Sequence, residues 1–107
     1  MASIKPETLA AQIESGHAPV ILDVRSRGEF GGGHVPGAIH VPFWDVRDRS
    51  SSFPAATEEP IVVYCGHGPR AWIAGAALRR GGFARVIYLA GHMSAWRKAG
   101  LPEERQA

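Results

Sequence analysis

Three short apolar runs recur along the chain, and none of them alternates apolar with polar positions. They are Val20–Val24, which carries one charge near its end, Ile61–Tyr64 and Val86–Leu89. Continuous runs of this length are typical of strands that are buried on both faces, as in a parallel sheet. A fourth and weaker run, Ala38–Val41, stops at Pro42, which cannot donate a hydrogen bond to a sheet. The pattern predicts four strands.

Helical segments separate these runs. Pro6 suits the first turn of a helix, where its missing N–H leaves no hydrogen bond unmade, and Gly16 can end the same helix. The range 70–80 is apolar on most sides, which predicts a helix buried against the sheet. A short closing helix is expected over 94–99, and Ser50–Pro54 is expected to form a surface loop. Strands that alternate with helices predict a three-layer α/β domain with right-handed crossovers.

Composition narrows the class of protein. A chain of 107 residues suits a single domain over residues 1–107, and 45% hydrophobic residues are enough to bury one core. The net charge is +2 without any basic run, so nucleic acid is a poor default partner. The start of the chain lacks an apolar signal core, and no run approaches the roughly 18 apolar residues that cross a bilayer. We therefore expect a cytoplasmic protein with no membrane partner. The alternative that the chain is one domain of a longer protein stays open.

The most informative segment follows the second apolar run. Cys65, the only cysteine, begins a turn with glycines at positions 66 and 68, and this turn opens the second predicted helix. Glycines allow a tight loop whose backbone N–H groups point inward, and a helix start adds partial positive charge. Both features favour a thiolate and can hold an anionic group bonded to its sulfur. Asp23 also ends a predicted strand, at the edge where such sheets bind ligands. The alternative is that Cys65 is an inert buried side chain.

Three stretches resemble, in their order along the chain, the signatures of rhodanese domains. They are Leu22–Arg25 with Glu29, Phe30 and Gly33–Ile39; the Cys65–Arg70 loop; and Gly82, Phe83, Val86, Leu89 and Trp96–Pro102. The resemblance spans nearly the whole chain. It implies a three-layer rhodanese-like fold with a five-stranded, mostly parallel sheet and helices on both faces.

The resemblance also implies a reaction. A donor such as thiosulfate gives its outer sulfur to the cysteine, and an acceptor such as cyanide or a thiol takes it from the persulfide. Carried over residue by residue, Cys65 is the nucleophile, and Asp23 and Arg25 support the site. The expected anion cradle consists of Gly66, His67, Gly68, Pro69, Arg70 and Ala71. No cofactor or metal is expected, and a protein is a further candidate acceptor.

Two positions depart from the family pattern. Many members have a basic residue directly after the cysteine, whereas this chain has Gly66, so His67 and Arg70 must supply the positive charge. Alternatively, Arg70 pairs with a carboxylate such as Asp23 or Glu29. The typical Leu-x-Gly-Gly stretch corresponds to residues 89–92 here, and its last position is His92, whose role the sequence leaves open. The identity of the donor therefore stays open.

Several residues have structural readings beside the functional ones. We expect His34 to be a hydrogen-bonding residue of a turn rather than a catalytic base, and Trp96 to lie in the core. Trp72 follows the loop and either packs or walls the site. Two further readings stay open: Asp23 caps a backbone turn as well as bracing the loop, and Arg25 is only a salt-bridge partner on the rim.

Other function classes remain as alternatives. Certain cell-cycle phosphatases and arsenate reductases share this architecture, but their loop resembles a cysteine, five residues and an arginine. Only four residues separate Cys65 from Arg70, and the shorter loop suits a bonded sulfur atom better than a tetrahedral phosphate. A non-catalytic regulatory domain is another alternative, although such members often lack the cysteine. A dedicated persulfide carrier would share the chemistry and differ in its partner.

Overall fold

One parallel sheet organises the chain, and the computed structural model describes residues 1–106 of it. Ten helices and strands follow one another in these residues: β1 (Ser3–Ile4), α1 (Pro6–Glu14), β2 (Val20–Asp23), α2 (Arg27–Gly31), β3 (Ile39–His40), α3 (Val46–Arg49), β4 (Ile61–Tyr64), α4 (Pro69–Arg80), β5 (Val86–Leu89) and α5 (His92–Lys98). Short 3-10 turns, η1 (Phe43–Asp45) and η2 (Ser50–Ser52), flank α3. The predicted five-stranded parallel α/β fold is confirmed.

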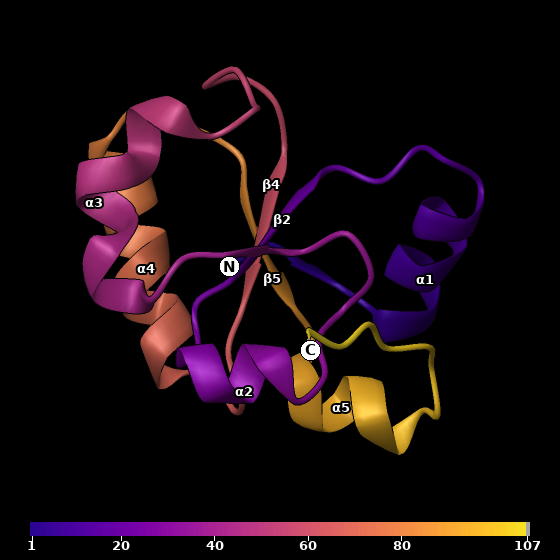
Figure 1. Ribbon diagram of the computed structural model, residues 1–107. Coiled ribbons are helices and arrows are strands. Elements are labelled where there is room, and N and C mark those ends of the chain that lie inside the picture. Colours follow the sequence, from indigo (N-terminus) through magenta and orange to yellow (C-terminus); the bar gives the residue numbers. More distant parts are fainter. Residues whose placement is uncertain (107) are drawn as a thin grey trace.

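The sheet has the strand order β1-β5-β4-β2-β3, and each neighbouring pair is parallel. α3 and α4 cover one face, and α1 and α5 cover the other (Figure 1). β4 lies in the middle, and all four of its side chains are fully buried. Val63 and Cys65 face the core beneath α4, whereas Val62 and Tyr64 face the core beneath α1 and α5. The pairing of Asp23 with Tyr64 brings the carboxyl ends of β2 and β4 together.

Some elements differ from the sequence prediction. β1 was not predicted, because two residues carry no periodic signal; it pairs Ser3 with Tyr88 at the edge of the sheet. α2 was not predicted either, because its five residues are too few to show a helical periodicity. Ser50–Pro54 was predicted as a surface loop. It contains the η2 turn, and Phe53 is buried because its ring packs against the ring of Phe83 in the core. α5 begins at His92, two residues earlier than expected.

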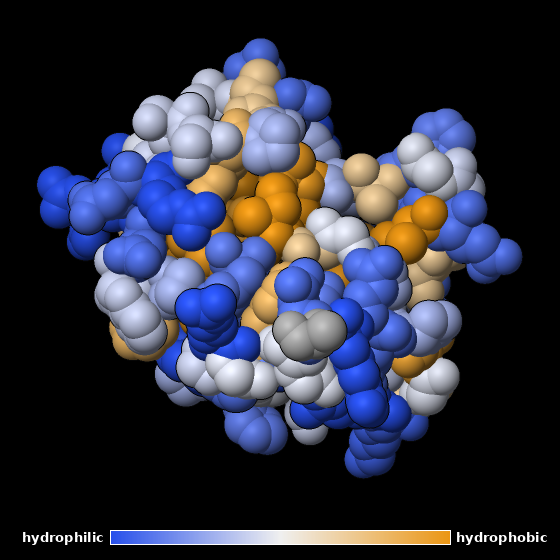
Figure 2. Space-filling view, in the orientation of Figure 1, coloured by the Kyte–Doolittle hydropathy of each residue, from blue (hydrophilic) through white to orange (hydrophobic). Residues whose placement is uncertain are grey.

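The surface of the face drawn in Figure 2 is mostly polar, and apolar residues gather in its middle, between the α3 side and the α1 side. β3 is the edge strand at the end of the sheet opposite β1 and pairs only with β2 among the described strands. Within residues 1–106, no helix has both the length and the apolar character that a bilayer crossing requires.

The close packing of α4 on β5 depends on a glycine, and this predicts a stability effect. A methyl group on Gly75 would overlap the hydroxyl of the buried Tyr88. We therefore expect Gly75→Ala to lower the free energy of unfolding by about 1–3 kcal/mol, measured by urea denaturation. Gly28→Ala is the matched control: it lies in α2 with open space around it, so the change should be below about 1 kcal/mol. Equal effects would contradict the packing argument.

Candidate active site

The turn from β4 into α4 carries the cysteine. Cys65 directly follows β4, its side chain is 1% exposed, and its Sγ accepts a hydrogen bond of 3.0 Å from the Gly68 N–H. Gly68 has φ 141°, a conformation that favours glycine, and a side chain there would crowd the Trp72 ring. The turn thus folds back on itself and directs a backbone N–H at the sulfur, just ahead of the first turn of α4.

The start of α5 supports the same turn from the other side. The Met93 N–H donates to the Cys65 carbonyl at 3.0 Å, and the Ser94 N–H donates to the Gly66 carbonyl at 3.3 Å. The Cys65 N–H donates to Nδ1 of His92 at 3.2 Å. His92 is buried and has φ 57°, a strained conformation that costs a non-glycine residue about 1–2 kcal/mol. Sequence reasoning left this residue without a role, because no pattern links position 92 to the cysteine.

A buried ion pair lies below the site. Asp23 Oδ2 binds Arg25 Nη2 at 2.8 Å and accepts a hydrogen bond of 2.7 Å from the Tyr64 hydroxyl. The Arg25 N–H also donates to Asp23 Oδ1, so the predicted turn cap is present. Arg25 was expected on the rim, but it is 2% exposed, because it also donates to the Gly33 carbonyl at 2.7 Å. Asp23 is fully buried.

The ionisation of this network is fixed by its surroundings. Burial alone would lower the pKa of Arg25, but its hydrogen bond with Asp23 and the charge of that carboxylate raise it overall. Burial and the negative charge of Asp23 also raise the pKa of Tyr64 far above its usual value. Arg25 therefore stays charged and Tyr64 stays protonated, as a donor must. The Val35 N–H donates to the same hydroxyl at 3.0 Å, which completes the network.

Arg70 is paired with a carboxylate. Its guanidinium binds both oxygens of Glu29, at 2.6 and 3.1 Å. Hydrogen bonding to Arg70, helped by Ser26, lowers the pKa of Glu29 to about 2. Ser26 and Glu29 also form a capping box at the start of α2, which fixes the carboxylate toward the loop. Of the two arrangements that the sequence left open for Arg70, the pair with Glu29 is the one observed.

A cleft of about 300 Å³ lies over the turn. It is lined by Arg25, Glu29, Gly66, His67, Arg70, Met93, Ser94 and Arg97. Of the predicted cradle, Gly66, His67 and Arg70 thus reach the cleft, and Gly68 contacts the sulfur below it. Pro69 and Ala71 do not line it, because they form the first turn of α4 and Ala71 is buried in the core. Arg97 is a lining residue that sequence reasoning missed.

The structure also shows the residues for which the sequence suggested structural roles. His34 is 3% exposed, its Nδ1 lies 2.8 Å from the Phe30 carbonyl, and its ring stacks on Phe30, so it is a structural residue as expected. Trp96 is 1% exposed and lies in the core. Trp72 is about half exposed and its ring lies against Gly68. In residues 1–106, no three His, Cys, Asp or Glu side chains converge as metal ligands would.

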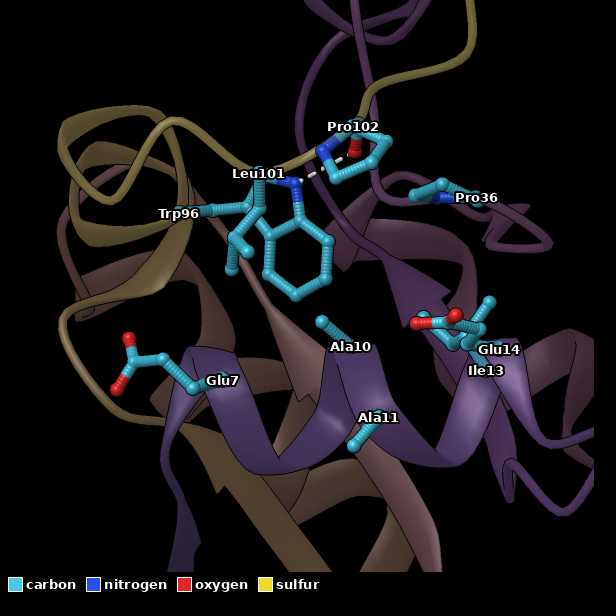
Figure 3. A pocket seen from close by; sticks show the side chains of 9 residues that line it. All are labelled: Glu7, Ala10, Ala11, Ile13, Glu14, Pro36, Trp96, Leu101 and Pro102. Carbon is cyan, nitrogen blue, oxygen red and sulfur yellow. Dashed lines mark hydrogen bonds between the residues drawn. The ribbon is translucent and has the colours of Figure 1, made fainter.

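A larger and more apolar pocket lies elsewhere, between α1 and the segment after α5 (Figure 3). Trp96 lies at its wall, and the indole N–H donates to the Pro102 carbonyl at 2.9 Å. Its charged lining residues are Glu7 and Glu14, which would repel an anionic sulfur donor. It also contains no nucleophile. The smaller cleft, which is lined by Gly66, His67 and Arg70 from the turn that follows Cys65, is therefore the candidate active site.

Comparison with known proteins shows the family of the chain. The family model of the rhodanese-like domain matches residues 5–99. The chain belongs to the rhodanese-like domain family. A sulfurtransferase of Allochromatium vinosum is 31% identical to this domain, with 92% of this chain and 91% of that protein covered.

Two further similarities add detail. The thiosulfate sulfurtransferase GlpE of Pseudomonas fluorescens is 34% identical to this rhodanese-like domain over 88% of the chain and 83% of that protein. The crystal structure of the Alr3790 protein of Anabaena superimposes with a TM-score of 0.86 at 34% identity, covering 96% of this chain and 92% of that one. Other curated relatives are longer, and the chain spans only 54% and 49% of two of them.

The Arg70–Glu29 pair predicts a pH-dependent contribution to stability. Because the pKa of Glu29 falls from 4.5 to about 2 on folding, the pair stabilises the fold above pH 4.5, and this stabilisation is lost as the pH falls toward 2. Both side chains are about one-third exposed, so solvent screening keeps the effect below about 1 kcal/mol. Glu29→Gln, which keeps the capping box, should therefore be less stable than the wild type at neutral pH. Urea denaturation should show the gap closing in acid; a constant gap would contradict the assignment.

Proposed function

We propose that this domain is a sulfurtransferase that carries sulfur as a persulfide on Cys65. The observation that carries the proposal is the hydrogen bond from the Gly68 N–H to the cysteine sulfur, in a turn whose Gly66, His67 and Arg70 line a cleft. The N–H stabilises negative charge on the sulfur, both on the free thiolate and during transfer. Membership of the rhodanese-like family and similarity to a thiosulfate sulfurtransferase support the same chemistry.

The proposed reaction has two displacement steps. The Cys65 thiolate attacks the outer sulfur of thiosulfate, the S–S bond of the donor breaks, and its electron pair leaves with sulfite. Cyanide or a thiolate then attacks the outer sulfur of the persulfide, and the electron pair of that S–S bond returns to Cys65. Neither step needs an oxidant or a proton from the protein. The domain therefore has to bind an anion and stabilise charge on sulfur.

We also propose a role in this chemistry for each of the remaining site residues. His67 is exposed at the cleft and offers donors to the sulfite portion, together with Arg70. Gly66 lines the cleft without obstructing it, because it has no side chain. Pro69 and Ala71 begin α4 and thereby fix the turn. Asp23 and Arg25 brace the ends of β2 and β4.

The central prediction concerns the mass of the protein. Incubation with thiosulfate should raise the intact mass by one sulfur atom, and added cyanide should restore it, because the acceptor removes the outer sulfur. Cys65→Ser should keep the fold and show neither change. Intact mass spectrometry measures both steps. Sulfur transfer by Cys65→Ser would refute the assignment, and a wild type that never gains mass would favour a non-catalytic regulatory domain.

The charges of the cleft predict opposite effects on donor binding. Arg70→Ala removes a positive charge and should raise the KM for thiosulfate, whereas Glu29→Gln removes a negative charge and should lower it. Each change should be about fivefold, since a unit charge a few ångströms away is worth about 1 kcal/mol in a water-filled cleft. Steady-state transfer to cyanide, with thiosulfate varied, measures the KM. A reduced melting temperature with unchanged KM in Arg70→Ala would instead assign the pair a purely structural role.

A further inference from the structure

His92 contacts both ends of the cysteine turn. Its Nδ1 accepts the N–H of Cys65 at 3.2 Å, where the turn begins. Its Nε2 lies 3.5 Å from the position that a β-carbon on Gly68 would occupy, and Gly68 is the residue whose N–H reaches the sulfur. The imidazole therefore fills the space between the first residue of the turn and the residue that stabilises the nucleophile. It is 6% exposed, so few other arrangements of the ring are open to it.

The hydrogen bond fixes the protonation state of this ring. A backbone N–H can only donate, so Nδ1 of His92 must be unprotonated, and the ring is neutral with its hydrogen on Nε2. The surroundings favour the same state, because burial and then the neighbouring His67 lower the pKa of His92. A second proton would convert Nδ1 into a donor that faces another donor. The contact with Cys65 would then be lost.

We propose that His92 is a positioning residue for Cys65: its neutral imidazole holds the start of the turn so that the sulfur meets the Gly68 N–H, and protonation of the ring releases it. This inference rests on the proposed function. The Cys65 and Gly66 carbonyls remain bonded to the Met93 and Ser94 N–H groups when the ring is charged. Protonation therefore disturbs the alignment of the sulfur and leaves the turn attached to α5.

Other groups near the turn also titrate or carry charge. His67 comes from the turn itself, the Cys65 thiol follows β4, and Arg25, Glu29 and Arg70 line the cleft above. Arg25, Glu29 and Arg70 keep their charges over the pH range in which histidine titrates, so they contribute a constant field around the turn. A comparison that changes only position 92 cancels their contributions, because they are common to all variants.

Two substitutions separate the hydrogen bond from the titration. In His92→Asn, the amide oxygen can take the place of Nδ1, accept the Cys65 N–H and never protonate, and asparagine tolerates a positive φ. In His92→Gly, the backbone strain is relieved, but the acceptor and the ring are both lost. The rate of persulfide formation in a single turnover is measured from about pH 4 to about pH 8, which extends below the usual range of histidine because the pKa of His92 is lowered.

The wild-type rate should fall in acid more steeply than that of His92→Asn, while the two rates agree within a few-fold near pH 8. His92→Gly should be slower by about tenfold or more at every pH, since a small misplacement of a reacting atom costs that much. A merely structural role for the side chain would require the melting temperature of His92→Gly to fall, whereas we expect no fall. Equal pH profiles for the wild type and His92→Asn, or a wild-type rate in His92→Gly, would overturn the proposal.

A second readout does not depend on activity. In ¹⁵N-labelled protein, the Cys65 amide resonance should shift with the titration of the His92 imidazole, and this transition should be absent from His92→Asn. A Cys65 amide that ignores the His92 titration would overturn the inference even if sulfur transfer is observed. If the amide follows His92 but the wild type forms no persulfide, the proposed function fails while the link between these two residues stands.

Discussion

The site depends on the interactions that the buried carboxylate of Asp23 makes. A buried charge is costly unless it is paired and hydrogen-bonded. Here Arg25 pairs with the carboxylate and the Tyr64 hydroxyl donates a hydrogen bond to it. Asp23 ends β2 and Tyr64 ends β4, so the contact fixes these strand ends against each other. Tyr64 immediately precedes Cys65. The position of the cysteine is thus set by a charge requirement one residue away.

The remaining contacts of the turn act on a cysteine that is already placed. α5 binds the carbonyls of Cys65 and Gly66, the Gly68 N–H just before α4 reaches the sulfur, and α2 presents Glu29 to Arg70. Two of these helices are short: α5 has seven residues and α2 has only five. Short helices are marginal on their own, so their geometry here comes from packing and capping. The site is therefore built from elements that only the sheet and its core hold in place.

The sequence predicted the fold well where the signal is physical and local. Continuous apolar runs revealed three buried strands, and glycines beside Cys65 revealed the turn. β1 and α2 escaped detection, since two or five residues cannot show a periodicity; the Ser26–Glu29 capping box was the one local signal for α2. The two contacts that define the environment of the turn, Arg70 with Glu29 and His92 with Cys65, join residues 41 and 27 positions apart. Side-chain pairings at such separations follow from the packed structure and not from local pattern.

The two departures from the family pattern act on the same turn and change its chemistry together. Gly66 leaves the turn without a fixed positive charge after the cysteine, and the charge of Arg70 is balanced by Glu29. His92 occupies a position with positive φ that suits glycine, so its strain must be offset by what its ring contacts. Those contacts are the Cys65 N–H and the space beside Gly68. Under the inference that His92 positions Cys65, the turn has the charge of Arg70 balanced by Glu29 and its start held by an imidazole, so the protonation of one histidine changes the alignment of the sulfur.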